Sequence, residues 1–435
     1  MLLRRAALLA VLLSGSAAQA QPVTLAESSK PGDCSQVSIV LSVAGELLVN
    51  QEGQQQRITL KAGGVHSFAE RTLAVEAGLP ASSARLYDKA EASVSIGGEP
   101  FKHALAADRR TVIARRGTAG LFCYALAGPL TRDELDLVTE HFNPQCLPGL
   151  LPGKDANVND TWPVGNAAAQ AACQFDGLVK NGLTGKLLEV KDGFATFSIE
   201  GTAEGIENGG KVTLVVSAIG KFDITAKRIV EFTWKQKDER EQGPVSPASQ
   251  VDATIGLRRT LLPMEPAELS ANALAAVKDE VPAALAQLRY VDAKSRFQLA
   301  YPRDWHITGQ TDSHVIFRLL DRGELIAQAT ISNWRSLPAG MHLAPDEFKK
   351  AVASSPGWMQ SKVIEDAEVP IDSGRWLYRL TAEGKLDEQP IVQRFHVLAG
   401  PKGDHVVVTC AMKPDAAKAV GTRDVEIVKA IEFKK

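Results

Sequence analysis

The sequence has no excess of charge of either sign. Its 435 residues include 49 Lys and Arg against 51 Asp and Glu, which gives a formal net charge of -2. Proteins that bind nucleic acid usually carry a basic surface, so this balance argues against that class of partner. Charged residues make up 23% of the chain and hydrophobic residues 45%, a composition typical of a folded globular protein.

Long apolar runs are missing beyond the first residues, so the sequence predicts no transmembrane anchor. Residues 1–20 read MLLRRAALLAVLLSGSAAQA. Arg4 and Arg5 form a positive region, a short apolar segment follows, and Ala18-Gln19-Ala20 fits a cleavage site. We therefore expect a signal peptide, a mature chain that begins at Gln21, and export to the periplasm or the cell exterior.

Cysteine is scarce, and the count of five is odd, so at least one cysteine has no partner within the chain. Because export leads to an oxidising compartment, we expect two disulfides, Cys34–Cys123 and Cys146–Cys173. Cys410 ends an apolar run and is expected to be a free thiol in the core. The alternative is that all of them are buried thiols, since free cysteine is often buried.

Local signatures of catalysis and of phosphate or metal binding are absent or incomplete. The chain has no HExxH zinc motif, and no GxSxG follows the signal segment. Gly205 to Lys211 satisfies GxxxxGK, but Val212 replaces the Ser or Thr that would hold magnesium, and the setting is a hairpin. Residues 155–160 begin like a calcium loop but carry Asp160 where glycine is needed. We therefore expect no enzyme activity, no cofactor and no bound metal; a hydrolase with a dispersed site is the alternative.

The chain does contain many short segments with β-branched or alternating residues, separated by turns such as Asn208-Gly209-Gly210. Thr131 and Glu134 form a capping box that predicts a helix over 132–141. Residues 235–241 carry charges of both signs and are expected to be a solvated strand end. The predicted fold class is α+β, with two antiparallel β-rich modules followed by an α/β sandwich.

These patterns divide the chain into six expected units. They are a signal peptide at 1–20, a β-rich N-terminal domain with a closing helix at 21–146, a linker at 147–164, an antiparallel β-meander or half-barrel at 165–262, a helical connector at 263–288 and an α/β domain at 289–435.

The opening of the last unit has a recognisable pattern. Phe297, Tyr301, Pro302 and Trp305 form the sequence F-x-x-x-Y-P-x-x-W, followed by further strands, a helix from Pro345 and a hairpin–helix ending. In these features the unit resembles the PsbP-like family, which also includes DcrB-type periplasmic proteins. The resemblance implies an antiparallel sheet between helices. It also implies a binding or assembly role without an agreed active site, so no catalytic residues carry over.

Four arginines bracket a short predicted strand at 111–114. They are Arg109, Arg110, Arg115 and Arg116. We interpret them as a basic edge that contacts an acidic partner, a lipid headgroup or a polysaccharide. The alternative is an edge strand that its charges protect against pairing.

The function that these observations favour is non-enzymatic binding of a protein partner, or assembly, at the cell envelope. The alternative is a carrier of a lipid or other apolar ligand in the middle β module. Four aromatic residues would line such a site: Phe194, Phe197, Phe222 and Phe232. Their other possible role is plain core packing.

Overall fold

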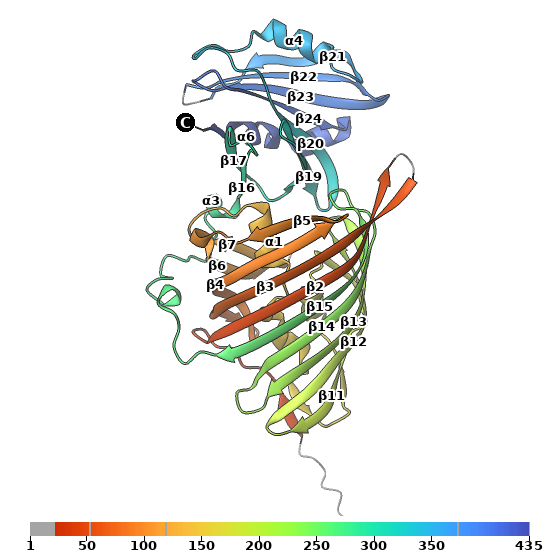
Figure 1. Ribbon diagram of the computed structural model, residues 1–435, viewed down its shortest axis with the longest axis vertical. Coiled ribbons are helices and arrows are strands. Elements are labelled where there is room, and N and C mark those ends of the chain that lie inside the picture. The colour runs from red at the N-terminus through yellow and green to blue at the C-terminus, as the bar shows by residue number, and fades with distance from the viewer. Residues whose placement is uncertain (1–21, 52–53, 118–119, 372–373, 435) are drawn as a thin grey trace, which may run out of the picture.

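The structure is a computed structural model, and we describe residues 22–51, 54–117, 120–371 and 374–434. The expected signal peptide at 1–20 lies outside these ranges. Figure 1 shows a large curved sheet in the lower part of the molecule and a smaller C-terminal part above it. In the described ranges, no helix has both the length and the apolar character needed to cross a bilayer.

The large sheet is antiparallel and contains thirteen strands in the described ranges. Its order is β7-β6-β4-β3-β2-β15-β14-β13-β12-β11-β9, while β5 pairs with β4 and β10 pairs with β12. The strands are β2 (Cys34–Gln51), β3 (Gln54–Glu76), β4 (Leu79–Ile96), β5 (Glu99–Ala104), β6 (Thr111–Gly117), β7 (Gly120–Ala125), β9 (Thr161–Pro163), β10 (Gly177–Asn181), β11 (Thr184–Lys191), β12 (Phe194–Glu207), β13 (Gly210–Asp223), β14 (Arg228–Arg240) and β15 (Ala248–Leu261).

The pairing of β2 with β15 joins the two β-rich regions of the sequence into this one sheet. The ladder runs from Ser35 opposite Leu261 to Leu48 opposite Ala248. Gly45 makes the close approach possible, because a Cβ there would lie 2.1 Å from the carbonyl oxygen of Gln250. The α+β class with antiparallel, β-rich architecture is thus confirmed, and the two β-rich regions are halves of a single sheet.

Helical segments cover the concave face of the sheet. They are α1 (Arg132–Thr139), the 3₁₀ helix η2 (Pro144–Leu150) and α2 (Asn166–Cys173). The capping box predicted for α1 is present, with Thr131 and Glu134 bonded reciprocally. Residues 147–151, at the start of the expected linker, pack into the core, whereas residues 153–161 are mostly exposed. Leu147 is fully buried, and the Trp162 indole donates a 2.9 Å hydrogen bond to the carbonyl oxygen of Leu150. Two short strands, β1 (Val23–Leu25) and β8 (Lys154–Ala156), pair beside this segment.

The C-terminal part contains two sheets with helices on both faces of the larger one (Figure 1). Its two hydrophobic clusters alternate along the strands, so that Leu377 packs on one face and Tyr378 on the other, beneath α4. The elements are β16 (Leu288–Val291), β17 (Phe297–Tyr301) and β25 (Ile431–Phe433) in the small sheet, and β18 (Trp305–Gln310), β19 (His314–Asp321), β20 (Glu324–Asn333), β21 (Trp358–Glu368), β22 (Trp376–Leu386), β23 (Gln389–Ala399) and β24 (His405–Met412) in the large one, with α4 (Pro345–Ala353), the 3₁₀ helix η4 (Pro414–Ala416), α5 (Ala417–Val420) and α6 (Arg423–Lys429).

Arg303 links the C-terminal part to the curved sheet. Its guanidinium donates 2.7 Å hydrogen bonds to the carbonyl oxygens of Ala286 and Cys123, and lies 4.0 Å from the centre of the Phe122 ring. The segment between the two parts, expected to be a helical connector, holds only the 3₁₀ turn η3 (Ala267–Leu269) and the short α3 (Ala283–Ala286). The two parts therefore pack directly against each other.

The expected disulfides are wrong, because all five cysteines lie within the described residues as buried free thiols. Cys34 packs in a cluster with Tyr124, whereas Cys123 points to the opposite face of β7 and contacts the carbonyl oxygen of Val138. Cys146 and Cys173 are separate thiols in the core, and Cys410 is fully buried on β24. Burial raises the pKa of Cys123 to about 11 and the pKa of Cys173 to about 12.

We expect the folded protein to react slowly with iodoacetamide at pH 8, because burial keeps these thiols protonated and inaccessible. The same protein denatured without a reducing agent should gain five carbamidomethyl groups, as measured by intact mass. A gain of only three carbamidomethyl groups before reduction would show one disulfide, and a gain of only one would show two. Either result, rising to five groups after reduction, would contradict the structure.

Candidate ligand-binding cavity

A cavity of about 450 Å³ lies between the concave face of the sheet and the helices that cover it. The side chains that reach it from the sheet occupy alternate positions along each strand, as the pleat requires. Most of those from the central strands are apolar, and several are small. They are Leu41, Val43, Leu47, Leu60, Ala62, Gly64, Ala92, Val94, Val251, Ala253 and Ile255.

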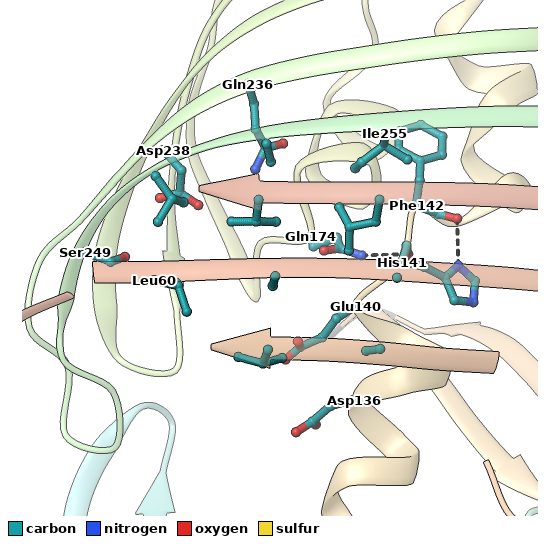
Figure 2. A pocket seen from close by; sticks show the side chains of 18 of the residues that line it. Leu60, Asp136, Glu140, His141, Phe142, Gln174, Gln236, Asp238, Ser249 and Ile255 are labelled. Atoms are coloured by element: carbon teal, nitrogen blue, oxygen red, sulfur yellow. Dashed lines mark hydrogen bonds between the residues drawn. The ribbon is translucent and has the colours of Figure 1, made fainter. Parts of the chain in front are cut away.

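Helix α1 forms an acidic wall of this cavity. Asp133, Asp136, Leu137 and Glu140 have spacings of three and four residues, which place them on one face of the helix. Glu140 is the C-terminal cap of α1. The helix dipole has its negative end there, so a carboxylate at this position is electrostatically unfavourable. Figure 2 shows Asp136 and Glu140 projecting from the helical side of the cavity.

The wall opposite α1 comes from the end of β14. Inward-facing positions on this strand begin with the aromatic residues Phe232 and Trp234, and then change to Gln236, Asp238 and Arg240. The segment 235–241 is thus the end of β14, as expected, and it is solvated on one face only, since Lys235, Lys237 and Glu239 are exposed and Asp238 is only 8% exposed. Alternation along the strand could have identified this inward polar set, because it continues the register of the buried aromatics.

Burial raises the pKa values of four carboxyl groups that line the cavity. It raises the pKa of Asp136 to about 6. The pKa of Glu140 rises to about 7, mainly through burial and further through the Asp136 carboxylate. Burial also raises the pKa of Glu207 to about 7, although Glu207 is ion-paired with Arg240. The pKa of Asp238 is raised for the same reason. Asp136, Glu140 and Glu207 therefore change protonation at or near neutral pH.

Four buried polar atoms of cavity-lining residues lack hydrogen-bond partners among the residues that the structure describes. They are Oδ1 of Asp238, Nδ1 of His66, Nε of Arg240 and Oγ of Ser246. An unpaired buried polar atom costs about 1–3 kcal/mol relative to a paired one. The ionised Asp238 oxygen can therefore accept a hydrogen bond from a bound molecule, and the Arg240 Nε–H can donate one.

A buried polar network lies behind the cavity. Arg85 on β4 donates to Glu70 at 2.6 Å and to Asn143 at 2.7 Å. The Tyr87 hydroxyl and Nε2 of His141 are 2.9 Å apart. Burial lowers the pKa of His141 well below its usual range and raises that of Tyr87, so both groups stay neutral at pH 7. The network supports the cavity floor. Because Tyr87 and His141 are both neutral, the Tyr87 hydroxyl is not activated as a nucleophile.

A second constellation in the C-terminal part resembles a catalytic triad in composition only. Nε2 of His396 lies 2.8 Å from the Asp424 carboxylate, and Cys410 is nearby on β24. All three side chains are fully or almost fully buried, and burial raises the pKa of the Cys410 thiol. The thiol is therefore neither ionised nor accessible. In the ranges that the structure describes, no group of three or more His, Cys, Asp or Glu residues is placed to hold a metal ion.

The arginines expected to form a basic edge do not lie on an edge strand. Arg115 and Arg116 belong to β6, which is paired on both sides, with β4 and with β7. Arg115 donates to the carbonyl oxygens of Lys278 and Asp279, and Arg110 donates to that of Tyr87 at 2.6 Å. Arg109 is bonded to Asp108 and to the Pro129 carbonyl oxygen. At least three of the four thus have structural partners.

The four phenylalanines expected to line an apolar site are placed elsewhere on the same sheet. Phe197, Phe222 and Phe232 are buried in the aromatic core, where Phe232 lies 5.3 Å from Phe142, while Phe194 stacks with Lys221. None of the four is among the residues that line the cavity. They therefore have the packing role that was their alternative interpretation.

No known protein family matches the chain. No curated protein matches it significantly. Among solved structures, the cyanobacterial PsbP (CyanoP) from Synechocystis sp. PCC 6803 is 16% identical, covers 36% of this chain and 99% of its own, and gives a TM-score of 0.28. A lipovitellin structure is 9% identical, covers 55% of this chain and 27% of its own, with a TM-score of 0.31. The type VI secretion immunity protein TplEi from Pseudomonas aeruginosa is 9% identical. It covers 50% of this chain and 72% of its own, and gives a TM-score of 0.21. At these values we draw no functional argument from the resemblances.

The Glu140 carboxyl should make stability depend on pH. Between pH 4.5 and about 7 the unfolded chain releases this proton while the folded protein keeps it, so rising pH favours unfolding. We expect Glu140→Gln to become more stable relative to wild type across this interval and to level off above pH 7, in thermal unfolding followed from pH 4.5 to 8.

The histidines with lowered pKa values have the opposite slope, but their contribution cancels in the difference between variant and wild type. Glu231 on the convex face is the matched control, and Glu231→Gln should show no such trend. A difference for Glu140→Gln that is flat with pH would contradict the raised pKa.

Proposed function

We propose that the curved sheet binds an apolar or amphipathic small molecule in the cavity on its concave face. The observation that carries this proposal is the 450 Å³ space, which is floored by apolar side chains and bordered by polar ones. Small-molecule sites in proteins typically have volumes of about 300–1,000 Å³ and the same combination of an apolar lining with a few polar groups. The proposal moves the carrier function expected for the middle β module to the seam between the two halves of the sheet.

The floor of the cavity is preformed because it belongs to strands paired on both sides. Each square ångström of apolar surface that a ligand buries contributes about 25 cal/mol. In a preformed site, little of this binding free energy is lost to the ordering of loops. The central strands β2, β3 and β15 therefore supply a preformed apolar surface. The small residues on it, Ala62, Gly64 and Ala253, leave space for a ligand.

Binding of a protein partner at the cell envelope was the other function expected from the sequence. The longest exposed edge for such a partner is β21, at one end of the C-terminal sheet. This strand carries two irregularities in its pairing, and Lys362 and Asp366 are among its charged residues. Bulges and charges of this kind protect an edge from pairing. The cavity is therefore the better-supported site.

We also propose that the protein is exported and acts in the periplasm or outside the cell, as the N-terminal segment predicts. Expression of the full chain with a C-terminal tag in a Gram-negative host should give a processed protein in the periplasmic or extracellular fraction. Its N-terminal residue, determined by Edman sequencing, should be Gln21. Recovery of the unprocessed chain from the cytoplasm would contradict this part of the proposal.

Ligand binding can be tested with phenylnaphthylamine, a neutral probe whose fluorescence rises in apolar sites. We expect the wild-type protein to bind it saturably. Ala253→Phe, which fills the cavity from the middle of β15, should weaken binding about tenfold or more, because the ring occupies the ligand's space. Ala62→Phe, from β3, should have the same effect.

Thr254→Phe is the matched control, because Thr254 is the next residue on β15 and points to the exposed convex face. It should bind the probe like wild type. Thermal unfolding would show that each variant is folded. No saturable binding by wild type, or equal loss in Ala253→Phe and Thr254→Phe, would contradict the proposed site.

A further inference from the structure

We propose that the ligand is a cationic amphiphile, a molecule with an apolar chain on the sheet and a protonated amine against the acidic wall. This inference rests on the proposed function and names the class of ligand that the same cavity selects. It is carried by the carboxyl groups that three separate elements bring together, and by a buried Asp238 oxygen that lacks a partner among the described residues.

The carboxyl groups come from different parts of the chain and act on one another. Asp136 and Glu140 lie on the α1 side, Glu207 ends β12, and Asp238 lies on β14. Figure 2 shows Asp136 and Glu140 on the helical side and Asp238 on a strand across the cavity. The Glu140 and Asp238 carboxylates both contribute to the raised pKa of Glu207. Glu140, Glu207 and Asp238 therefore add their negative charges at the same end of the cavity.

The cavity contains little positive charge to balance these groups. Its lining includes five carboxyl groups and one guanidinium, Arg240, which is already paired with Glu207. Of its three histidines, His66 has a pKa lowered to about 4 by burial, and His141 is also lowered. An anionic ligand would meet repulsion from the unpaired carboxylates, whereas a cation would be attracted to them.

An ammonium group also matches the unpaired Asp238 oxygen. It has three N–H donors and no acceptor. Oδ1 of Asp238 has no partner among the described residues, and the residue is only 8% exposed. The C-terminal end of α1, where Glu140 lies, adds the negative end of a helix dipole, which favours a cation. Hydrogen bonds between charged groups are about twice as strong as neutral ones.

The acidic wall should make binding of the amine depend on pH. The charged groups that face Glu140 are Asp136 on α1, Arg132 at its start and Arg240 on β14, while Glu207 is also influenced by Asp176 and Asp238. Raising the pH through 6 to 7 ionises the carboxyl groups and leaves an aliphatic amine protonated. Affinity for the amine should therefore rise with pH over this interval.

The test is displacement of phenylnaphthylamine from the full-length protein at pH 8 by three molecules with the same decyl chain. We expect decylamine to compete about tenfold more strongly than decanol, and decanoate to compete more weakly than decanol. Spermidine, which carries amines without an apolar chain, should compete poorly. Equal competition by spermidine and decylamine would overturn the amphiphile in favour of a hydrophilic polyamine.

Two variants remove acceptors while keeping the shape of the cavity. Asp238→Asn and Glu140→Gln should each weaken competition by decylamine about tenfold and leave decanol unchanged. Glu140→Gln should also reduce the rise in decylamine affinity between pH 6 and 8. Glu231→Gln, on the convex face of the same strand as Asp238, should compete like wild type.

The two proposals fail in different ways. If wild type binds the probe and Ala253→Phe does not, but decylamine and decanol compete equally or decanoate competes best, the cavity is a ligand site without amine selectivity. If neither the probe nor any decyl compound binds, the proposed function itself is wrong. Loss of both decylamine and decanol competition in Asp238→Asn would show a structural effect and overturn the assigned role of Asp238.

Discussion

The ladder between β2 and β15 is the interaction on which the rest of the structure depends. It pairs residues 35–48 with residues 248–261, so it joins segments separated by roughly half of the chain. Without it, each half of the large sheet would expose an edge and an uncovered apolar face. With it, the sheet is long enough to curve around α1, η2 and α2, and α1 comes to lie opposite β14. The cavity exists only where these two halves meet, since its floor takes side chains from β2 and β3 on one side of the ladder and from β15 and β14 on the other.

Side-chain size decides which part of the concave face is core and which part is cavity. Where Phe142, Phe232 and Trp234 meet, ring centres lie 5.3 to 6.1 Å apart and the space is filled. Further along β14 the inward positions become polar, and the facing positions on neighbouring strands are small or aliphatic, such as Ala62 and Ala253. Close packing is the rule for protein interiors, so a face that carries small residues beneath a helix leaves space that the protein's own side chains do not fill. One sheet thus provides both a stable core and an open site.

The sequence could predict local features well and long-range ones poorly. The capping box of α1, the turn at Asn208-Gly209-Gly210 and the antiparallel, β-rich class all follow from short patterns, and the structure contains them. The single sheet depends on pairing between β2 and β15, for which a single sequence carries no register signal. Disulfides were inferred from the compartment and from order along the chain. The opposite orientation of Cys123 and Tyr124 on β7, which separates Cys123 from Cys34, requires knowing which face of the sheet each residue meets. The acidic wall could be predicted in part. Asp133, Asp136 and Glu140 share one face of a helix by their spacing, and Asp238 lies on the same face of β14 as the buried aromatic residues.

Several features of the residues around the cavity lower the stability of the folded protein. A carboxyl group terminates a helix whose dipole disfavours it, buried carboxyl groups retain protons to near-neutral pH, and a buried Asp238 oxygen has no partner among the described residues. Elsewhere in the same sheet the buried charge of Arg85 is balanced by Glu70, although Nη1 of Arg85 also lacks a partner among the described residues. Natural sequences usually agree across local and global levels, and the exceptions concentrate at functional sites. Because a cation in the cavity would relieve all three unfavourable features at once, binding it would stabilise the folded protein beyond the gain from its apolar contacts. The uncompensated acids are thus better explained as one half of an interaction than as part of the scaffold.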